Sequence, residues 1–348
     1  MNTKTIYVLH KNGADNHYIG LKQLLQENDI EIKFREFSIF GKLFKSLIKG
    51  KPKLLKKQII NLIFVAKLLI SKNKKIVLGI APFDDKLNRL LPLLKRHSVY
   101  YHTSWTCWDK SFNPKQTKNK KTYTTWRRFL EHKAKHIFCV TKTAKNSLLA
   151  NYQLKPEKIS VVYHAVDKAF FTDFKTEKKQ NSFVYVGRLV QEKGLVEVLD
   201  FFKENTTIQL TIIGRGKLGN LAEDAAKSSE NIYYLGGISD KSKLAEILSD
   251  QQYLLLNSKK TKKWEELFGM VIIEGMAQGL IPISSNHSGP SEIIKKEIGL
   301  VFPEGELNST LSKVINAIPN PKKSALAKKE AHLFNLQNIS KKWKPILT

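Results

Sequence analysis

The chain has 348 residues and a formal net charge of +28, with 42% hydrophobic residues and two cysteines. This hydrophobic content is sufficient for packed cores, so a largely disordered chain is excluded. Two isolated thiols, Cys107 and Cys139, do not make a disulfide framework or a cysteine-ligated metal centre, and they suit a reducing compartment. The length exceeds the usual size of a single core and predicts two domains.

The first half of the chain alternates strands with helices such as Tyr18–Gln26 and Thr143–Tyr152. Because the first strand begins almost at the N-terminus, we expect no secretory signal peptide. The alternation predicts a parallel sheet covered by helices on both faces. Its strands are predicted at Thr5–Leu9, Glu31–Phe37, Lys75–Ile80, Ser98–His102, His136–Thr141 and Ile159–His164.

The most apolar stretch of the chain, Ile59 to Ile70, is interrupted by Asn61 and Lys67. A helix that spans a bilayer needs roughly 20 predominantly apolar residues. We therefore predict a buried or surface-lying helix here and no transmembrane helix.

The second half repeats the alternation after a polar segment, Lys175–Asn181, which we interpret as a linker. Two doubly wound units in succession predict an α/β fold of two facing Rossmann-like domains with a cleft between them, and such sheets bind ligands beyond the carboxyl ends of their strands. We expect an N-terminal domain at residues 1–175, a C-terminal domain at 176–334 and a last helix at 335–348 that can cross back to the first domain. Strands of the second domain are predicted at Ser182–Val186, Gln209–Ile213, Ile232–Leu235, Tyr253–Asn257, Ile281–Ser284 and Gly299–Phe302.

The most informative segment contains two glutamates, Glu266 and Glu274, separated by seven residues. Gly269 is predicted to precede a helix that Gly279 ends. The unpaired N–H groups and partial positive charge of a helix N-terminus suit an anionic, oxygen-rich ligand. The two carboxylates can then accept hydrogen bonds from the hydroxyl groups of a sugar and a ribose, although two glutamates near a helix start are also common without any function.

A second candidate group follows the first strand of the second domain, in Tyr185-Val-Gly-Arg-Leu-Val-Gln-Glu-Lys-Gly194. Arg188 and Lys193 are predicted to emerge beyond the carboxyl end of this strand. The planar guanidinium of arginine grips a diphosphate well, and lysine adds a point charge. The alternative interpretation is a solvated loop in a lysine-rich protein.

Phe268-Gly269 between the two glutamates, and Glu274-Gly-Met-Ala-Gln-Gly-Leu-Ile-Pro282, resemble the donor-binding signature of the family 4 retaining glycosyltransferases of bacterial surface-glycan type. The resemblance implies the GT-B fold, with the nucleotide-sugar donor on the second domain and the acceptor on the first. It also implies catalytic roles for four residues: His102, Arg188, Lys193 and Glu266. The donor contacts that it implies are Gly13, Gly187, Arg188, Lys193, Gly214, Gly237, Ile238, Glu266, Leu267, Phe268, Gly269, Met270, Val271 and Glu274.

Two of these positions carry open questions. His102 ends a predicted strand, where relatives place a histidine that faces the transferred sugar, but a lone histidine there is more often a packed residue. Gly13 follows Asn12 where many relatives have two glycines, so the approach of this turn to the diphosphate stays open. Nearby His17 is expected on a helix surface, with the acceptor side as the alternative.

Metal and cofactor signals are missing from the sequence. Asp84-Asp85 is not an Asp-x-Asp pair, and the sequence has no zinc-ligand spacing and no P-loop. Gly214-Arg-Gly216 lacks the third glycine of a dinucleotide-binding loop. We expect no metal and no tightly bound cofactor, because two cations and a helix N-terminus can hold the donor diphosphate.

Positive charge is concentrated in the first half, where residues 1–175 carry a net +23 and the remaining residues +5. The segment Lys42–Lys57 interleaves lysines with large apolar residues, and Leu43, Phe44, Leu47 and Ile48 fall on one helical face. Such a helix can lie in a lipid interface with its lysines on anionic headgroups. Lys115–Arg128 adds a second basic cluster. We expect an anionic membrane surface as partner rather than nucleic acid, because no nucleic-acid-binding motif accompanies the charge.

Together these features predict a retaining glycosyltransferase that moves a sugar from a nucleotide-diphosphate sugar to a lipid-linked or membrane-anchored glycan acceptor. Lipopolysaccharide, capsule or a related surface polysaccharide is the expected product. We expect the protein to be cytoplasmic, on the inner face of the cytoplasmic membrane. The alternatives are a nucleotide-sugar epimerase on the same fold, and a non-catalytic basic scaffold that binds a membrane or nucleic acid.

Overall fold

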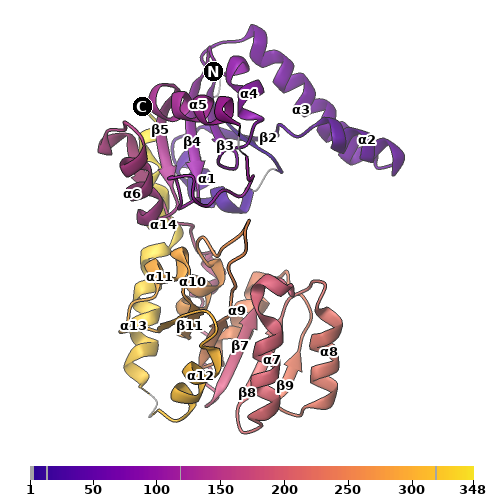
Figure 1. The fold of residues 1–348 in the computed structure, drawn as a ribbon, viewed down its shortest axis with the longest axis vertical. Coiled ribbons are helices and arrows are strands. Elements are labelled where there is room, and N and C mark those ends of the chain that lie inside the picture. The colour runs from indigo at the N-terminus through magenta and orange to yellow at the C-terminus, as the bar shows by residue number, and fades with distance from the viewer. Residues whose placement is uncertain (1–3, 13–14, 118, 318–319) are drawn as a thin grey trace. The chain divides into compact units, whose positions relative to one another are not determined.

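The computed structural model describes residues 4–12, 15–117, 119–317 and 320–348. The chain divides into two compact units, one of Met1–Ala165 with Gln337–Thr348 and one of Val166–Leu336. Each unit contains one parallel six-stranded sheet with helices packed on it (Figure 1). These are two Rossmann-like α/β units, as predicted.

The division between the units lies earlier in the chain than the expected boundary at residue 175. The Val166 N–H group donates to the carbonyl oxygen of Phe334 at 2.8 Å, and the Phe170 carbonyl accepts from the Gln278 side chain at 2.7 Å. The expected linker Lys175–Asn181 also lies inside the second unit, where the Lys178 ammonium donates to the Gln278 carbonyl oxygen at 2.7 Å. Its polar composition suggested a linker, but these contacts anchor it.

The sheet of the first unit has the strand order β2-β1-β3-β4-β5-β6, with every neighbouring pair parallel. All six predicted strands of this half are present, with shifts at their ends. The strands are β1 (Thr5–His10), β2 (Glu31–Glu36), β3 (Lys75–Gly79), β4 (Ser98–Thr103), β5 (Ala134–Cys139) and β6 (Ile159–Val161).

The helices of the first unit occupy the segments between its strands, and the last helix returns from the C-terminal end of the chain. They are α1 (Ile19–Gln26), α2 (Phe40–Ile48), α3 (Pro52–Ile70), α4 (Leu87–Leu93), α5 (Lys120–Arg128), α6 (Lys142–Asn151) and α14 (Leu336–Lys342). The Trp343 side chain after α14 is buried, with its ring centroid 4.4 Å from that of Phe138. The Lys75 ammonium donates to the carbonyl oxygens of Ile346 and Leu347 at 3.0 and 2.8 Å. The C-terminal segment is therefore anchored on this sheet.

The second unit has the strand order β12-β11-β10-β7-β8-β9, again all parallel. Its strands match the predicted ones to within a residue at each end. They are β7 (Ser182–Val186), β8 (Gln209–Ile213), β9 (Ile232–Tyr234), β10 (Tyr253–Leu256), β11 (Ile281–Ser285) and β12 (Leu300–Phe302).

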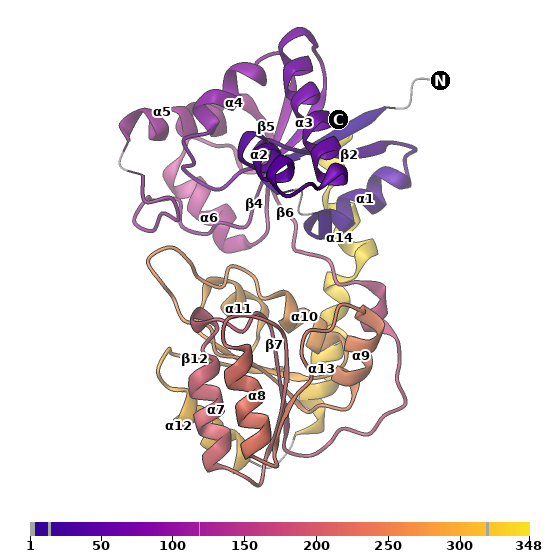
Figure 2. The same ribbon diagram turned by 90° about the vertical axis from the view of Figure 1, so that its right-hand side faces the viewer.

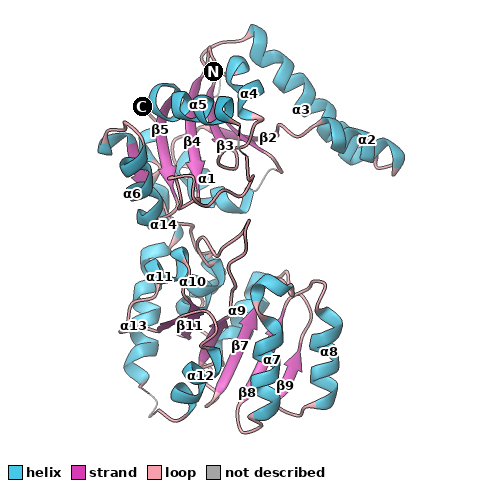
Figure 3. Ribbon diagram, viewed as in Figure 1, coloured by secondary structure: helices cyan, strands magenta, loops and turns pink. Residues whose placement is uncertain are grey.

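Helices cover both faces of this second sheet (Figures 2 and 3). On one face, apolar side chains of α7 (Leu195–Glu204), α8 (Gly219–Ser228) and α12 (Leu307–Ile315) form one buried core with the strands. The opposite face carries α9 (Lys241–Ser249), α10 (Met270–Ala277) and α13 (Pro321–Ala331). The short helix α11 (Ser288–Ile293) follows β11. The two-sided cover explains why the strands are apolar almost throughout.

Helices α2 and α3 expose an unusual amount of apolar surface. Phe40, Ile48 and Ile70 are 75%, 69% and 82% exposed. Phe64 and Leu68 of α3 are buried, so this helix lies on the surface of its unit with one face packed. Among the residues that the structure describes, no helix is both long and apolar enough to cross a membrane.

Candidate functional site

The turn that follows β7 ends at a glycine, Gly194, which holds it in place. Gly194 has φ of 62°, and a Cβ atom there would lie 2.0 Å from the Asn257 carbonyl oxygen. The Asn257 side-chain amide donates to the Gly194 carbonyl oxygen at 3.0 Å, and the Tyr185 hydroxyl donates to the Lys193 carbonyl oxygen at 2.9 Å. Only glycine tolerates this conformation and this close approach. The turn is therefore fixed against the end of β10.

Lys193 and Glu266 meet at the carboxyl edge of the second sheet. The Lys193 Nζ atom forms an ion pair with Oε2 of Glu266, and the two side chains are only 12% and 13% exposed. The Ser258 hydroxyl donates to the same Oε2 at 3.2 Å. The Lys193 ammonium also lies 4.9 Å from the ring centroid of Trp264, a cation–π arrangement. The structure thus brings together two residues that are far apart in the sequence and that were both predicted as site residues.

The loop before α10 packs against the first turn of α11. The Gly289 N–H group donates to the Glu266 carbonyl oxygen at 3.2 Å, and a Cβ atom on Gly289 would lie 2.3 Å from the Phe268 Cα atom. Gly269 precedes α10 with φ of 85°, and no side chain caps the helix. The first N–H groups of the helix are then left for water or a ligand. The predicted residues at this tip are buried or half-buried: Leu267, Phe268, Gly269, Met270 and Val271.

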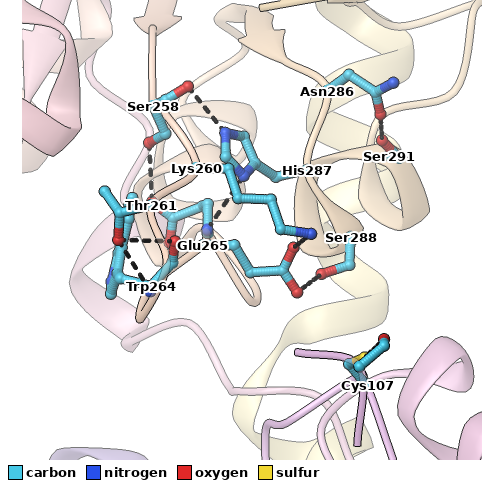
Figure 4. Close-up of polar contacts among 12 residues, drawn as sticks. Cys107, Ser258, Lys260, Thr261, Trp264, Glu265, Asn286, His287, Ser288 and Ser291 are labelled. Atoms are coloured by element: carbon cyan, nitrogen blue, oxygen red, sulfur yellow. Dashed lines mark hydrogen bonds and ion pairs between the residues drawn. The ribbon is translucent and has the colours of Figure 1, made fainter. Parts of the chain in front are cut away.

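His287 supports this arrangement (Figure 4). The Glu266 N–H group donates to Nδ1 of His287 at 3.3 Å, and Nε2 lies 2.8 Å from the Ser258 carbonyl oxygen. Because Nδ1 accepts, Nε2 carries the proton and donates to the carbonyl. Sequence reasoning missed His287, Ser258 and Trp264, since their roles arise from contacts between segments that are separate in the chain.

A cavity of about 400 Å³ opens beyond the carboxyl ends of β7 and β8. A Cβ atom on Gly214 would lie 1.8 Å from the Gly187 carbonyl oxygen, so the two turns that border the cavity touch through glycine. The Arg188 side chain is 61% exposed, and its guanidinium lies 3.7 Å from the Glu192 carboxylate. Five predicted residues line this cavity: Gly187, Arg188, Gly214, Gly237 and Ile238. Arg215 lines it as well and brings a second guanidinium that the sequence reasoning did not assign.

Glu274 has different neighbours from Glu266, namely Lys241 and Asp167. Burial raises the pKa of Glu274 to about 7; the nearby Lys241 opposes that shift and Asp167 adds to it. Lys241 begins α9, two residues after the cavity-lining Ser239. Within the described residues, the Glu274 carboxyl group has neither a hydrogen bond nor an ion pair. A carboxyl group with a raised pKa can donate a hydrogen bond to a ligand hydroxyl group when it is protonated and accept one when it is ionised.

His102 lies in the first unit, at the carboxyl end of β4, and its side chain is buried. Its ring centroid is 4.9 Å from that of Tyr18, 5.2 Å from that of Trp343 and 6.2 Å from that of His164. Burial is the main cause of a pKa for His102 well below its usual value, and the nearby His164 lowers it further. His102 is therefore a neutral, packed histidine. Gly13 lies outside the described residues.

Three further histidines surround this position and form, with His102, a group that we call the histidine cluster: His10, His17, His102 and His164. The rings of His17 and His164 lie 4.7 Å apart, edge to face. Burial lowers the pKa of His10 to about 4 and that of His164 to about 3. Of these three histidines only His17 was predicted, on a helix surface with the acceptor side as the alternative, and its side chain is exposed. The cluster itself could not be predicted, because it forms where β1 and the segments after β1 and β6 meet β4.

The region described by the structure contains no group of three or more histidine, cysteine or acidic side chains placed to hold a metal ion. Asp84 forms an ion pair with Lys115 at 2.8 Å.

Comparison with known proteins follows the same division of the chain. The family profile for "Glycosyl transferases group 1" matches residues 167–333, and that for "Glycosyltransferase Family 4" matches residues 51–170. The capsular polysaccharide biosynthesis glycosyltransferase CapH of Staphylococcus aureus is 27% identical over 243 residues, which is 65% of this chain and 64% of CapH. The chain matches 42% to 64% of the length of CapH and three other curated relatives.

Solved structures show the same fold. The apo form of the lipopolysaccharide outer core galactosyltransferase WaaB has a TM-score of 0.66 at 17% identity, with 99% of each chain covered. Anabaena HepE in complex with UDP has a TM-score of 0.65 at 13% identity, also with 99% of each chain covered. With the two family profiles, these matches show that the chain belongs to the family 4 (group 1) glycosyltransferases and has the GT-B fold.

Proposed function

We propose that the chain is a retaining glycosyltransferase that moves a sugar from a nucleotide-diphosphate sugar to a lipid-linked or membrane-anchored glycan. The observation that carries this proposal is the meeting of Lys193 and Glu266 beside the uncapped N-terminus of α10, on the same turn that presents Arg188 to the cavity. A carboxylate, two cations and free backbone N–H groups suit a ligand that combines hydroxyl groups with a diphosphate.

In the proposed donor complex, Arg188 and Lys193 hold the diphosphate. The nucleoside occupies the cavity of about 400 Å³ lined by Gly187, Gly214 and Gly237. The structure of HepE with UDP has the same fold and supports a uridine or related nucleotide as the occupant.

The proposed transfer breaks the bond between the anomeric carbon and the diphosphate oxygen, and both electrons leave with the nucleoside diphosphate. The acceptor hydroxyl oxygen bonds to the anomeric carbon on the same face of the sugar ring, which retains the configuration. The hydroxyl proton passes to the departing phosphate oxygen. Arg188 and Lys193 stabilise the charge that develops on the diphosphate as this bond breaks, and such charge stabilisation is often the largest catalytic contribution.

The two glutamates take different parts in this proposal. Glu266 is fixed by Lys193, by Ser258 and, through its backbone, by His287. Its carboxylate can accept a further hydrogen bond from a hydroxyl group of the transferred sugar. Glu274, half-buried near Lys241, is suited to a ribose hydroxyl. The two cations and the α10 tip supply the positive charge that a metal ion provides in other transferases, so we propose a metal-independent donor site.

The first unit is the proposed acceptor unit. CapH is named for capsular polysaccharide biosynthesis and WaaB for the lipopolysaccharide outer core, and both names support a surface glycan as the product class. The neutral imidazole of His102, at the carboxyl end of β4, can exchange hydrogen bonds with sugar hydroxyl groups without charge.

The exposed apolar side chains of α2 and α3 support a membrane-bound acceptor. Phe44 and Ile48 of α2 are exposed, and Lys45 and Lys49 lie beside them. An amphipathic helix of this kind binds anionic bilayers with its apolar face in the interface. We therefore propose that the protein docks on the cytoplasmic face of the membrane, where lipid-linked acceptors are found.

The test is a thermal-shift screen of nucleoside diphosphates and nucleotide sugars, followed by a nucleotide-release assay with and without membrane extracts. A ligand that binds only the folded chain raises the melting temperature. Release of nucleoside diphosphate that depends on the extract supports the transferase. Conversion of the nucleotide sugar without any acceptor would instead favour an epimerase.

A further inference from the structure

A second cavity lies between α4 and α5 of the first unit, with a volume of about 620 Å³. The two helices lie side by side (Figures 1 and 2), and the Asn88 side-chain amide donates to the Thr122 hydroxyl between them at 3.2 Å. This volume falls within the usual range of small-molecule sites, roughly 300 to 1,000 Å³. The lining residues are Asn88, Leu91, Pro92, Lys95, Lys121, Thr124, Thr125, Arg128, His132 and Lys133.

The lining is basic and lacks a compensating acid. Lys95, Lys121, Arg128 and Lys133 all contribute, and none of the ten lining residues is acidic. Neither the guanidinium of Arg128 nor the ammonium groups of Lys95 and Lys121 form an ion pair with any residue in the described ranges. By contrast, the neighbouring Arg127 outside the cavity pairs with a glutamate. Cations gathered in a concave, partly apolar space attract an anion more strongly than cations on an open surface.

Lys133 is held in position for such an anion. Its ammonium donates to the carbonyl oxygens of Lys95 and His97 at 3.0 and 2.8 Å. Burial and the nearby Lys135 lower the pKa of Lys133. A bound anion would stabilise the charged form of Lys133, which burial and Lys135 disfavour.

The cavity is separate from the candidate site already described. Lys95 and Lys133 lie just before β4 (Ser98–Thr103) and β5 (Ala134–Cys139), at the amino ends of these strands. His102 lies at the opposite, carboxyl end of β4. The two features therefore occupy opposite edges of one sheet.

We propose that this cavity binds a phosphate ester. A guanidinium and three ammonium groups match the charge and oxygen geometry of a phosphate, and the Thr125 hydroxyl adds a hydrogen-bonding partner. Leu91 and Pro92 offer an apolar wall for the carbon skeleton that carries the phosphate. The ligand is either a soluble phosphate ester or the phosphodiester headgroup of an anionic lipid, since both present the same group.

The test uses the full chain and isothermal titration calorimetry with glycerol 3-phosphate as the probe and glycerol as the uncharged comparison. The double substitution Lys121→Gln and Arg128→Gln removes two cations that line the cavity. The matched control, Arg89→Gln with Lys120→Gln, removes an arginine and a lysine from the same two helices at exposed positions outside the lining. Flotation with phosphatidylcholine vesicles, with and without phosphatidylglycerol, is run on the same three proteins.

The cavity variant is expected to bind the phosphate probe at least about tenfold more weakly, and the control to match the wild type, because only the cavity variant loses charge-assisted hydrogen bonds to the phosphate. Weaker glycerol phosphate binding identifies a soluble ligand, and a selective loss of phosphatidylglycerol-dependent flotation identifies a lipid headgroup. The wild type, the cavity variant and the control all have an unchanged donor site, so any phosphate that binds there contributes equally to the three measurements. The proposal is wrong if the wild type binds neither glycerol 3-phosphate nor vesicles with phosphatidylglycerol. It is also wrong if the cavity variant loses no more affinity than the control.

Discussion

Lys193 and Glu266 form an ion pair that joins the turn after β7 to the loop before α10. The pair is mostly shielded from solvent, since only 12% and 13% of the two side chains are exposed. A partly buried pair is weak evidence of stabilisation, because taking both charges out of water offsets much of their attraction. Its position at the tip of an uncapped helix instead indicates a preorganised place for a ligand.

Glu266→Gln is expected to separate binding from turnover. Glutamine keeps the shape of the side chain and can still accept from Lys193, so affinity for a nucleoside diphosphate is expected to stay within a few fold of wild type. The proposed charged hydrogen bond to the sugar would be lost, and kcat/KM is expected to fall by about 10- to 100-fold. Steady-state kinetics and calorimetry measure the two effects.

The matched control for that variant is Glu223→Gln, which removes an exposed carboxylate of α8 that pairs with Lys227. Its kinetics are expected to match those of the wild type. Unchanged kcat/KM in Glu266→Gln would show that the Glu266 carboxylate has no part in the mechanism.

Gly194→Ala is expected to destabilise the second unit by at least about 2 kcal/mol, because the residue has a left-handed backbone and an added Cβ atom would meet the Asn257 carbonyl oxygen at 2.0 Å. Urea unfolding followed by circular dichroism measures the loss. Gly41→Ala in α2 is the control: its Cβ atom meets nothing within 4 Å, and alanine is expected to favour the helix by roughly 0.5–1 kcal/mol. Equal stability of the two variants would show that the turn is not as rigid as described.

Acid is expected to destabilise the first unit through the histidine cluster. The folded-state pKa values of His10 and His164, about 4 and about 3, lie below the ordinary value of 6.5. The unfolded chain therefore binds more protons than the folded chain between those values, so stability falls as the pH drops below about 6.5. Each such group contributes up to about 1.4 kcal/mol per pH unit in this range.

The measurement is the urea midpoint at pH 7.5 and at pH 5.5 for wild type and for His164→Asn. The variant is expected to lose less stability between the two pH values, because one imidazole that takes up a proton only in the unfolded chain is gone. His332→Gln, which changes a histidine outside the cluster, serves as the control. A variant with the pH dependence of the wild type would contradict the assignment.

Membrane docking is expected to depend on α2. Phe44→Ser with Ile48→Ser removes two exposed apolar side chains, each of which contributes about 1.5–3 kcal/mol when buried in an interface, so the vesicle-bound fraction is expected to fall more than tenfold. Leu333→Ser changes a similarly exposed leucine in the second unit and is expected to bind like wild type. Equal flotation of wild type with neutral and anionic vesicles would argue against electrostatic docking.

The strands and the α10 helix could be predicted from the sequence because their signals are local. The apolar runs of the strands are short and continuous. Gly269 and Gly279, which both have positive φ, lie on either side of α10. The helix ends at Ala277, one residue before its predicted last residue, Gln278. The predicted last helix, by contrast, ends early at Lys342 and is followed by a short 3-10 turn containing Pro345.

The supporting residues of the site could not be predicted in the same way. Ser258 and His287 act on Glu266 through contacts between separate segments, and nothing in their local sequence indicates this. The histidine cluster likewise forms only when the parallel strands bring their carboxyl ends to one edge. Composition predicts a linker at Lys175–Asn181, whereas hydrogen bonds of the Lys179 backbone and the Lys178 side chain tie the segment to the second unit.

The most direct test of the central claim measures donor diphosphate binding by Arg188→Ala and by Lys193→Ala, with Lys203→Ala on α7 as the control. The probe is UDP or GDP, whichever raises the melting temperature of the wild type more. Each site variant is expected to lose about 2 kcal/mol of binding free energy, roughly thirtyfold in Kd, and the control to lose none. Wild-type affinity in both site variants would contradict the account.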